Sequence, residues 1–424
     1  MLSQLGALLT RLPVVRRRSA RRHPSRLIAT ALCLTPSVLF GQADSSRAHP
    51  DSARRIEQVL VTAIRASNLA PIAQKTVSRG ELARRQFGQD VPLLLSNSSP
   101  GLTAHSESGT NWGYSYLRLR GLDQTRINIT FDGVPLNDME DQVLYFANFA
   151  DLLSGVESVQ IQRGVGTSTA GTASFAGSIN LESEPIATRA PDGHLELQLG
   201  SFGAQRASVN YRSGLLGDRF AVGARAGILR TNGYRDHSGV RGGSAWVGAG
   251  WFGDHDIVKL TGLVGELADT LSYVGATLDE LRQNRRFNPL SPDEQDRFGQ
   301  QLAALSYTRI VSDAASFSTT VYRNSAGGSY DYFYLPDKYR YNLMHTWYGA
   351  TSAWTYARDR WHASLGVNAN TYQRAHRAYD EIATTTLYDN TGHKSDASGF
   401  AKASYSVGRV RWFADVQARH ARFR

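Results

Sequence analysis

The sequence predicts an all-β membrane protein in which a smaller α+β domain precedes an antiparallel transmembrane β-barrel. From about residue 193 onward, apolar and polar residues alternate along successive segments, which is the pattern of strands with one apolar and one hydrated face. The connections between these segments are alternately short and long, as on the two sides of a membrane barrel. Earlier in the chain, Gly, Asp and Pro interrupt short apolar runs, which indicates a separate mixed domain.

Residues 1–43 are expected to be a cleaved signal peptide. Seven arginines lie between residues 11 and 26, an apolar stretch follows from Leu27 to Phe40, and small residues allow cleavage after Ala43. The apolar stretch has about 14 residues, fewer than the roughly 20 that a transmembrane helix needs. Removing the segment lowers the formal charge from +10 to +3, because it contains seven arginines and no acidic residue. The remaining chain has no basic run, so we expect no nucleic-acid partner.

No motif predicts a cofactor, a metal or a disulfide. The single cysteine, Cys33, lies in the predicted signal peptide, so the mature chain has no thiol chemistry. Glycines at 164, 166 and 171 resemble a phosphate-binding loop, but the lysine that would reach a phosphate is missing. Four carboxylates lie close together in the sequence: Asp132, Asp138, Glu140 and Asp141. Their spacing does not match a calcium-binding loop, and we expect them to form a turn with a solvated surface.

Residues 44–68 are predicted to be a flexible N-terminal segment that contains one β-prone stretch. Residues 44–56 are polar and charged and cannot bury a core. The stretch that follows consists of Glu57, Gln58, Val59, Leu60, Val61, Thr62 and Ala63. A strand between flexible flanks can add to the exposed sheet edge of a partner through backbone hydrogen bonds. The alternative is an ordinary first strand of the domain that follows.

Residues 69–186 are predicted to form the first domain, which carries four short motifs. They are Arg120-Gly121, the run from Asp132 and Gly133 to Asn137, Ile161–Gly164 with Arg163 before Gly164, and Gly177–Asn180. The Asp-Gly pair predicts a tight reversal after a strand. The glycines allow positive φ and close approach of strands, so we interpret them as fold residues and not as ligand contacts.

Residues 192–424 are predicted to contain about eleven strands. Leu195, Leu197 and Leu199 alternate with polar residues, and similar segments begin at Phe220, Trp361 and Val410. A soluble sandwich would alternate in the same way, so the connections decide. Short links are expected at 214–217, 253–256, 312–315, 357–360 and 406–409, and long ones at 231–239, 266–300, 324–345 and 373–395. Tryptophans are candidates for an interfacial girdle or for simple strand formers: Trp251, Trp347, Trp354, Trp361 and Trp412. Since an open sheet edge in hydrocarbon is costly, we expect the chain to be an incomplete part of a larger barrel.

The β-prone stretch and the four motifs, in this order and spacing, resemble those of TonB-dependent outer-membrane receptors. The resemblance covers about residues 57–183 and continues less specifically into the later strands. It implies that residues 57–63 are the TonB box and that residues 69–186 are a plug inside a barrel of about 22 strands, of which about 11 are present. Buried Arg120 and Arg163 would then need carboxylate partners, for which Glu157 is the candidate.

The resemblance implies a receptor in the cell outer membrane and not an enzyme. TonB, driven through ExbB and ExbD, would pull on the box to open a path for an extracellular ligand. An iron–siderophore complex is the expected ligand, while cobalamin, haem, other metals, glycans and peptides stay open. A small barrel hydrolase is the alternative of another class, but no motif fixes a Ser-His pair and a small barrel has no room for the plug. A passive porin is the third reading, and the predicted TonB box and plug argue against it.

Two groups of residues are candidates for ligand contact. The first lies where plug loops of the family reach toward ligand: His105, Asn111, Trp112 and Tyr114. The second lies in the long connection expected at 324–345: Tyr330, Tyr332 and Tyr334. Tyrosines at that position fit an aromatic girdle equally well.

Overall fold

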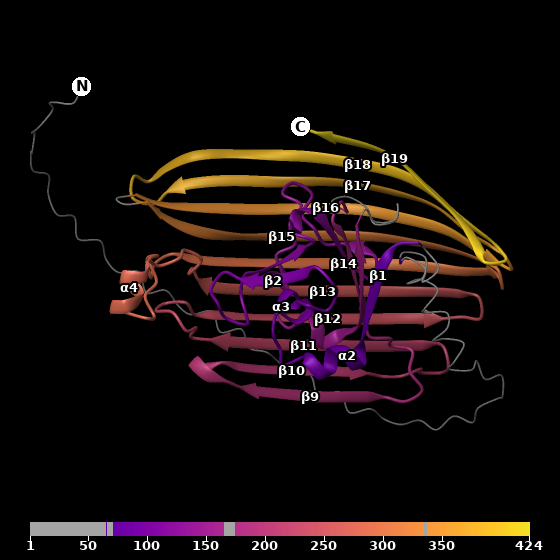
Figure 1. Cartoon of the computed structure of the whole chain (residues 1–424), viewed down its shortest axis with the longest axis horizontal. Helices are drawn as coiled ribbons and strands as arrows, with labels where there is room; N and C mark the ends of the chain where they lie inside the picture. Colours follow the sequence, from indigo (N-terminus) through magenta and orange to yellow (C-terminus); the bar gives the residue numbers. More distant parts are fainter. Residues whose placement is uncertain (1–64, 66–70, 165–173, 335–336) are drawn as a thin grey trace, which may run out of the picture. The chain divides into compact units, whose positions relative to one another are not determined.

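The structure is a computed structural model, which describes Arg65 and residues 71–164, 174–334 and 337–424. The predicted signal peptide and the stretch from Glu57 to Ala63 lie outside the described residues. The described chain consists of a mixed N-terminal domain, residues 71–183, and a large antiparallel sheet (Figure 1). This confirms the predicted fold class.

The described residues of the N-terminal domain form two sheets, two short α-helices and three 3-10 turns. The first sheet has the order β1-β7-β8-β5-β6 and the second β2-β3-β4. The strands are β1 (Ala73–Ser78), β2 (Leu102–Ser106), β3 (Ser115–Leu119), β4 (Leu122–Asp123), β5 (Ile127–Phe131), β6 (Val134–Pro135), β7 (Val156–Arg163) and β8 (Gly177–Ser183). The helical elements are α2 (Arg79–Arg85), α3 (Val91–Leu95), η1 (Gln124–Arg126), η2 (Phe146–Phe149) and η3 (Leu152–Gly155). Pairing is antiparallel except between β5 and β8.

Local sequence explains how these elements begin and turn. Helix α2 starts with a capping box, in which Ser78 and Glu81 each bond the other's backbone N–H. The predicted reversal between β5 and β6 is confirmed, since Asp132 and Gly133 have φ of 47° and 79°. This is the pair of positive φ values that a two-residue hairpin turn requires. Asn137 then secures the turn, because its side chain bonds the backbone of Ile127 and Ile129.

The large sheet has eleven strands, each paired with its neighbours in sequence (Figure 1). They are β9 (Asp192–Leu199), β10 (Gln205–Arg212), β11 (Phe220–Thr231), β12 (Val240–Phe252), β13 (Asp256–Thr270), β14 (Gln295–Ser312), β15 (Ala315–Tyr334), β16 (Asp337–Arg358), β17 (Trp361–Asp380), β18 (Thr385–Val407) and β19 (Val410–Phe423). Two short helical elements lie in connections: η5 (Ser201–Gly203) and α4 (Leu278–Gln283). The predicted strand count is confirmed.

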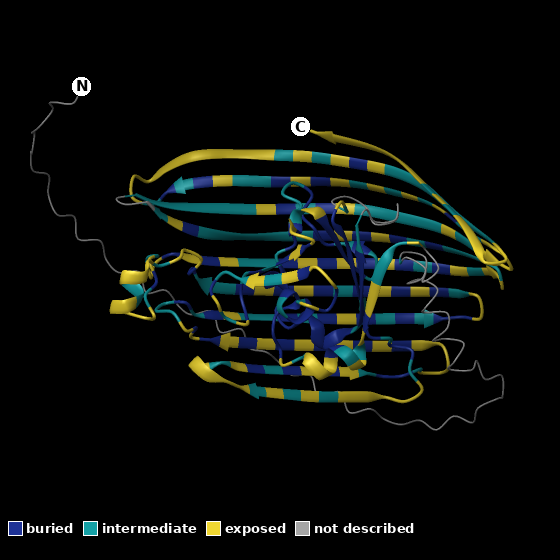
Figure 2. Ribbon diagram, viewed as in Figure 1, coloured by how far each residue is buried: buried dark blue, intermediate teal, exposed yellow. Residues whose placement is uncertain are grey.

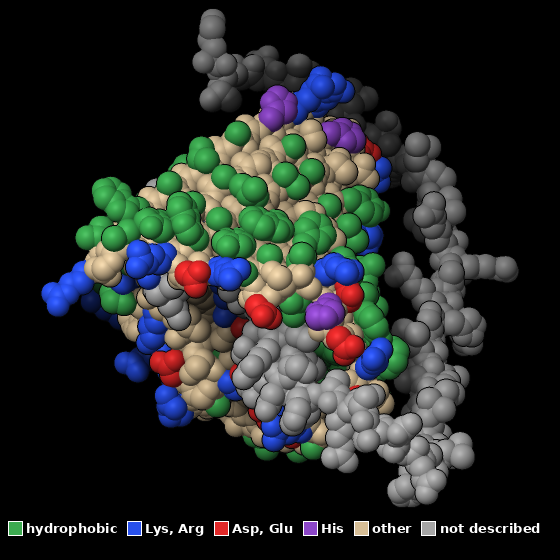
Figure 3. Space-filling model, turned by 90° about the vertical axis from the view of Figure 1, so that its right-hand side faces the viewer, with side chains coloured by type: hydrophobic (Ala, Val, Ile, Leu, Met, Phe, Trp, Pro, Cys, Tyr) green, Lys and Arg blue, Asp and Glu red, His purple; other side chains and the backbone are tan. Residues whose placement is uncertain are grey.

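The two faces of this sheet differ as the alternation predicts. Leu195, Leu197 and Leu199 are 65%, 73% and 83% exposed, and buried residues alternate with exposed ones along β10 and β11 (Figure 2). Hydrophobic side chains gather on one face in Figure 3, with charged side chains along its border. An exposed apolar face on a long sheet is the arrangement of a lipid-facing wall.

No helix among the described residues is long and apolar enough to cross a membrane.

Two of the expected long loops are wrong. The segments 324–345 and 373–395 are largely strand, because β15 to β18 have 20 to 23 residues each and leave only residues 335–336 and 381–384 between them. Such a strand is about 66 Å or more long, whereas the apolar band of a membrane barrel is about 25 Å tall. Beyond the membrane both faces meet water, so alternation fades although backbone pairing continues.

The tryptophans do not form one group. Trp354, Trp361 and Trp412 are 37%, 51% and 69% exposed, as a girdle requires. Trp347 is buried on the opposite face and lies edge-on against Tyr322 at 5.8 Å between ring centroids. The girdle interpretation is therefore wrong for Trp347, since its position on β16 points it toward the N-terminal domain.

Candidate functional site

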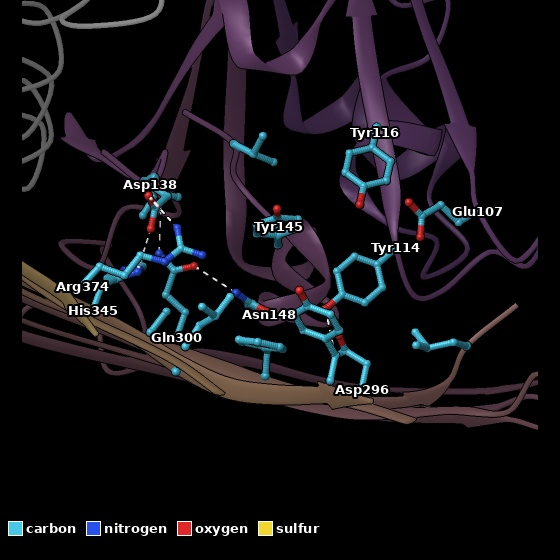
Figure 4. A pocket seen from close by; sticks show the side chains of 18 of the residues that line it. Glu107, Tyr114, Tyr116, Asp138, Tyr145, Asn148, Asp296, Gln300, His345 and Arg374 are labelled. Carbon is cyan, nitrogen blue, oxygen red and sulfur yellow. Dashed lines mark hydrogen bonds and ion pairs between the residues drawn. The ribbon is translucent and has the colours of Figure 1, made fainter. Parts of the chain in front are cut away.

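A cavity of about 300 Å³ lies between the N-terminal domain, the connection after β13 and strands β14 to β17 (Figure 4). The N-terminal domain contributes Glu107, Tyr114, Tyr116, Asp138, Tyr145 and Asn148. The strands and the connection after β13 contribute Tyr273, Asp296, Gln300, Tyr330, His345 and Arg374, with apolar residues between them. The cavity lies toward the end of the sheet that carries the longer connections, which is the extracellular side of a membrane barrel.

Three tyrosines of the N-terminal domain form one wall. The rings of Tyr114 and Tyr116 both meet Tyr145 edge-on, at 5.8 Å and 6.5 Å. Tyr114 also donates its hydroxyl proton to Asp296 of β14 at 2.9 Å. Edge-to-face contacts fix ring orientation, so this wall presents a defined aromatic surface.

The opposite end of the cavity contains a buried group of charges, here called the Asp138 cluster: Asp138, Asp141, His345, Tyr372 and Arg374. Asp138 accepts from His345 Nδ1 at 2.7 Å and from the Tyr372 hydroxyl at 2.8 Å. Arg374 lies 3.2 Å from both Asp138 and Asp141. Burial would raise the pKa of Asp138, but the hydrogen bond and charge of His345 and the charge of Arg374 hold it below its ordinary value. Burial and the charge of Asp138 raise the pKa of Asp141.

The expectation that Asp132, Asp138, Glu140 and Asp141 form a turn with a solvated surface is therefore wrong. Asp138 is 6% exposed, Glu140 lies 2.9 Å from His376 Nε2, and Asp132 lies 3.6 Å from Lys259. Lys394 of β18 also donates to the Met139 carbonyl at 2.5 Å. Their partners stand on strands more than 100 residues later in the chain, so no local pattern could reveal them.

A second buried group ties the N-terminal domain to β10 and β11. Arg206 lies 2.7 Å from Asp151 and 2.8 Å from Glu196. Arg225, whose side chain is fully buried, donates to the Asp151 carbonyl at 2.7 Å. The close fit leaves no room at Gly227, where a Cβ would come within 2.3 Å of Asp151. The domain is thus held by charge pairs at two separate stretches of the sheet.

Of the four ligand-contact candidates in the N-terminal domain, only Tyr114 lines this cavity. His105 is exposed on β2 with its ring 5.6 Å from that of Tyr116. The Asn111 carbonyl accepts from the backbone of Asp90 at 3.0 Å. Trp112 is buried and donates Nε1–H to the Gly88 carbonyl at 2.7 Å, so its visible role is structural.

The second group of candidates divides in the same way. Tyr330 lines the cavity and stacks on Tyr341 with 4.8 Å between ring centroids. Tyr332 is 39% exposed on β15 and does not line it. Tyr334 ends β15, and its side chain lies outside the described residues.

The expected pairing of Arg120 and Arg163 with Glu157 is wrong. Arg120 is exposed at the turn between β3 and β4, with φ of 53°. Arg163 donates to the Pro100 carbonyl at 3.5 Å, and no ion pair joins it to Glu157 in the described part of the chain. Both lie on β7, six residues apart, so their Cα atoms are about 20 Å from each other.

The remaining motif residues shape the N-terminal domain. Gly121, Gly164 and Gly177 have positive φ, and a Cβ at Gly177 would approach the Gln162 carbonyl oxygen to 2.0 Å. Asn180 accepts from the Thr130 hydroxyl at 2.6 Å, and Asp132 accepts from the Ser183 backbone at 2.8 Å. These contacts agree with the interpretation of the motifs as fold residues.

Within the described ranges, no group of three or more His, Cys, Asp or Glu residues is placed to hold a metal ion.

Comparison with known proteins places this geometry in a family context. The family model described as the TonB-dependent receptor plug domain matches residues 67–178. The ferric citrate transporter FecA is similar in structure, with a TM-score of 0.73, 15% identity, and coverage of 83% of this chain and 56% of FecA. The ferripyoverdine receptor of Pseudomonas aeruginosa has a TM-score of 0.72 and 13% identity, with coverage of 86% of this chain and 54% of the receptor. The ferric yersiniabactin uptake receptor FyuA of Yersinia pestis has a TM-score of 0.66 and 15% identity, with coverage of 85% of this chain and 62% of FyuA. This chain therefore spans between about half and two thirds of these structures. No curated protein sequence matches it significantly.

Proposed function

We propose that this chain, which carries a TonB-dependent receptor plug domain and eleven strands of a β-barrel, acts in an outer-membrane receptor that imports a scarce ligand. The observation that carries the proposal is the seat of the plug against the barrel wall. Buried charge pairs and hydrogen bonds join it to β10 and β11 at one place and to β16, β17 and β18 at another. Apolar contacts also join the two, since one buried cluster combines Trp112, Ala147 and Ala150 of the plug with Leu229, Val240 and Leu267 of the wall.

The energy is proposed to come from TonB, with ExbB and ExbD, acting on residues 57–63. That stretch lies only a few residues before β1, the edge strand of the plug sheet that pairs with β7. A pull on it would act directly on the plug. The proposed organisation is a signal peptide at 1–43, a flexible segment at 44–68, the plug at 69–186 and barrel strands at 192–424.

The proposed ligand is an iron–siderophore complex. Support comes from the solved structures that resemble this chain, which include a ferric citrate transporter and a ferripyoverdine receptor. The cavity beside Tyr114 and Tyr330 is the proposed contact site. A hydrolase is not supported, because the matching family model is that of a TonB-dependent receptor plug and the similar solved structures include transporters.

Uptake of radioactive iron by iron-limited cells tests the proposal. Val59→Pro removes a backbone donor from the middle of the proposed TonB box and prevents strand addition. We expect loss of energy-dependent uptake with binding at the cell surface retained. Ala48→Pro, in the preceding flexible segment, is the matched control and leaves uptake unchanged. Uptake that survives Val59→Pro contradicts the proposal.

A further inference from the structure

The positive charges of the cavity are already matched within the protein. His345 Nδ1 lies 2.7 Å from Asp138, and Arg374 lies 3.2 Å from both Asp138 and Asp141. A guanidinium shared between two carboxylates has little attraction left for a third anion. The Asp138 cluster therefore does not offer a free cation to a ligand.

Two carboxylates in the same cavity have a different environment. Asp296 accepts from the Tyr114 hydroxyl at 2.9 Å, and Glu107 accepts from the Tyr116 hydroxyl. In the described part of the chain no Lys, Arg or His forms an ion pair with either. Burial raises the pKa of Glu107, and the Tyr116 hydrogen bond acts in the opposite direction. The cavity thus has two carboxyl groups without a basic partner in the described part of the chain, and a bound cation would favour their charged forms.

Three further buried atoms at the cavity wall have no hydrogen-bond partner among the described residues. They are Asn148 Oδ1, His345 Nε2 and Arg374 Nε (Figure 4), of which Arg374 Nε lies 3.7 Å from Glu140. The Asn148 amide nitrogen donates to Gln300 at 3.3 Å, which leaves its oxygen as an acceptor. His345 donates from Nδ1 to Asp138. Leaving the Asn148 oxygen unsatisfied is costly, and a ligand that donates a hydrogen bond to it would remove the cost.

The rest of the wall is aromatic. Tyr114, Tyr116, Tyr145, Tyr273 and Tyr330 line the cavity. The faces of such rings attract cations. Carboxyl groups, a free acceptor and aromatic faces together form a surface that favours a positively charged group that donates hydrogen bonds.

We infer that this cavity binds a positively charged, hydrogen-bond-donating part of the imported ligand, such as an ammonium group, and that the receptor prefers cationic over anionic complexes. The inference rests on the proposed import function and names the chemical class of its ligand. The volume of about 300 Å³ is at the lower end for small-molecule sites, so the cavity holds part of a ligand of siderophore size.

Known iron-chelating groups give complexes of opposite charge, which allows the cationic and anionic classes to be compared. Three hydroxamates neutralise ferric iron, and a free amine on the chain makes the complex positive. Three catecholates give a complex with three negative charges, which would meet Glu107 and Asp296 with no free cation to offset the repulsion. The net charge of the complex is therefore the variable to test.

Binding is measured on outer-membrane fractions that carry the full-length gene product. The probes are ferrioxamine B, which is a cationic trihydroxamate, its N-acetylated neutral form, and the ferric tris-catecholate of enterobactin. We expect binding to ferrioxamine B that is stronger than to the neutral form, and no binding of the tris-catecholate. Glu107→Gln and Asp296→Asn should each weaken the cationic complex about tenfold and leave the neutral complex unchanged.

Asp279→Asn, on the exposed helix α4, removes a carboxylate far from the cavity and is the matched control. Unchanged binding of the neutral complex shows that each variant is folded. Equal or tighter binding of the tris-catecholate, or no binding of any probe, overturns the inference. Tris-catecholate uptake that depends on Val59 would overturn only the charge preference, whereas uptake that survives Val59→Pro would overturn the import function itself.

Discussion

Asp90 is a residue of the plug whose burial disfavours the charged form of its carboxyl group. Asp90 is 7% exposed, and its side chain accepts only a 3.3 Å bond from the Ser115 hydroxyl and one from the Gly113 backbone. Burial raises the pKa of Asp90 from 3.8 to about 8. Asp90 is the N-cap residue of α3, but its side chain makes no capping bond.

This shift predicts a pH-dependent stability. Between pH 4 and 8 the folded plug binds the Asp90 proton and the unfolded chain does not, so stability falls as pH rises, by at most about 1.4 kcal/mol per unit. Asp90→Asn should remove this slope. A fluorophore on Asn111→Cys reports unfolding in urea at several pH values. The same slope in both proteins would count against the assignment.

A second prediction at this scale concerns Gly177. With φ of 157° and a Cβ position 2.0 Å from the Gln162 carbonyl oxygen, Gly177→Ala should destabilise the plug by about 3 kcal/mol. Gly121→Ala is the control, because φ there is 80° and nothing lies within 4 Å; its expected cost is about 1 kcal/mol. Urea titration compares them, and equal losses would show that backbone strain alone decides.

At the scale of elements, the Asp138 cluster fastens the plug to β16 and β17. Asp138→Asn leaves His345 and Arg374 with one fewer charge partner, and breaking a buried pair in this way costs about 3 kcal/mol. We expect hydrogen exchange of residues 138–145 to accelerate on the order of a hundredfold. Asp279→Asn is the control, since its pair with Arg282 is 82% and 76% exposed. Unchanged exchange in Asp138→Asn would mean that the cluster does not hold the plug.

Sequence patterns predict some elements well and others not at all. The eleven strands and the tight turns follow from period-two alternation, because each wall strand meets lipid on one face. The length of β15 to β18 cannot be predicted from the same alternation, because a strand that extends beyond the membrane meets water on both faces. The Asp138 cluster is also invisible, because Tyr372 lies 234 residues from Asp138 in the chain. In the site, Tyr114 and Tyr330 were predicted, while Glu107, Asn148 and Asp296 stand in no recognisable motif.

At the scale of the whole molecule, the tall hairpins and short turns define two sides of a membrane. Ile382, between β17 and β18, is 61% exposed, and Arg409 lies in the short turn between β18 and β19. Cys33 is the single cysteine of the sequence, so in a Cys33→Ser background an introduced cysteine is the only thiol. We expect an impermeant maleimide to label Ile382→Cys on intact cells and Arg409→Cys only after lysis. Labelling in the reverse order would invert the proposed topology.

The order of strands in the sheet also determines the order in which contacts form during folding. Each strand pairs with the next in sequence, through links as short as residues 313–314, so the wall can grow by successive hairpins at little entropic cost. The contacts of Asp138 and Met139 with β17 and β18 instead close loops of 234 and 255 residues. The contacts of Asp151 with Arg206 and Arg225 close loops of only 55 and 74 residues, so the plug can meet β10 and β11 early. The segment around Asp138 and Met139 is fastened only after β17 and β18 exist, and during assembly it is the part of the plug that proteases reach longest.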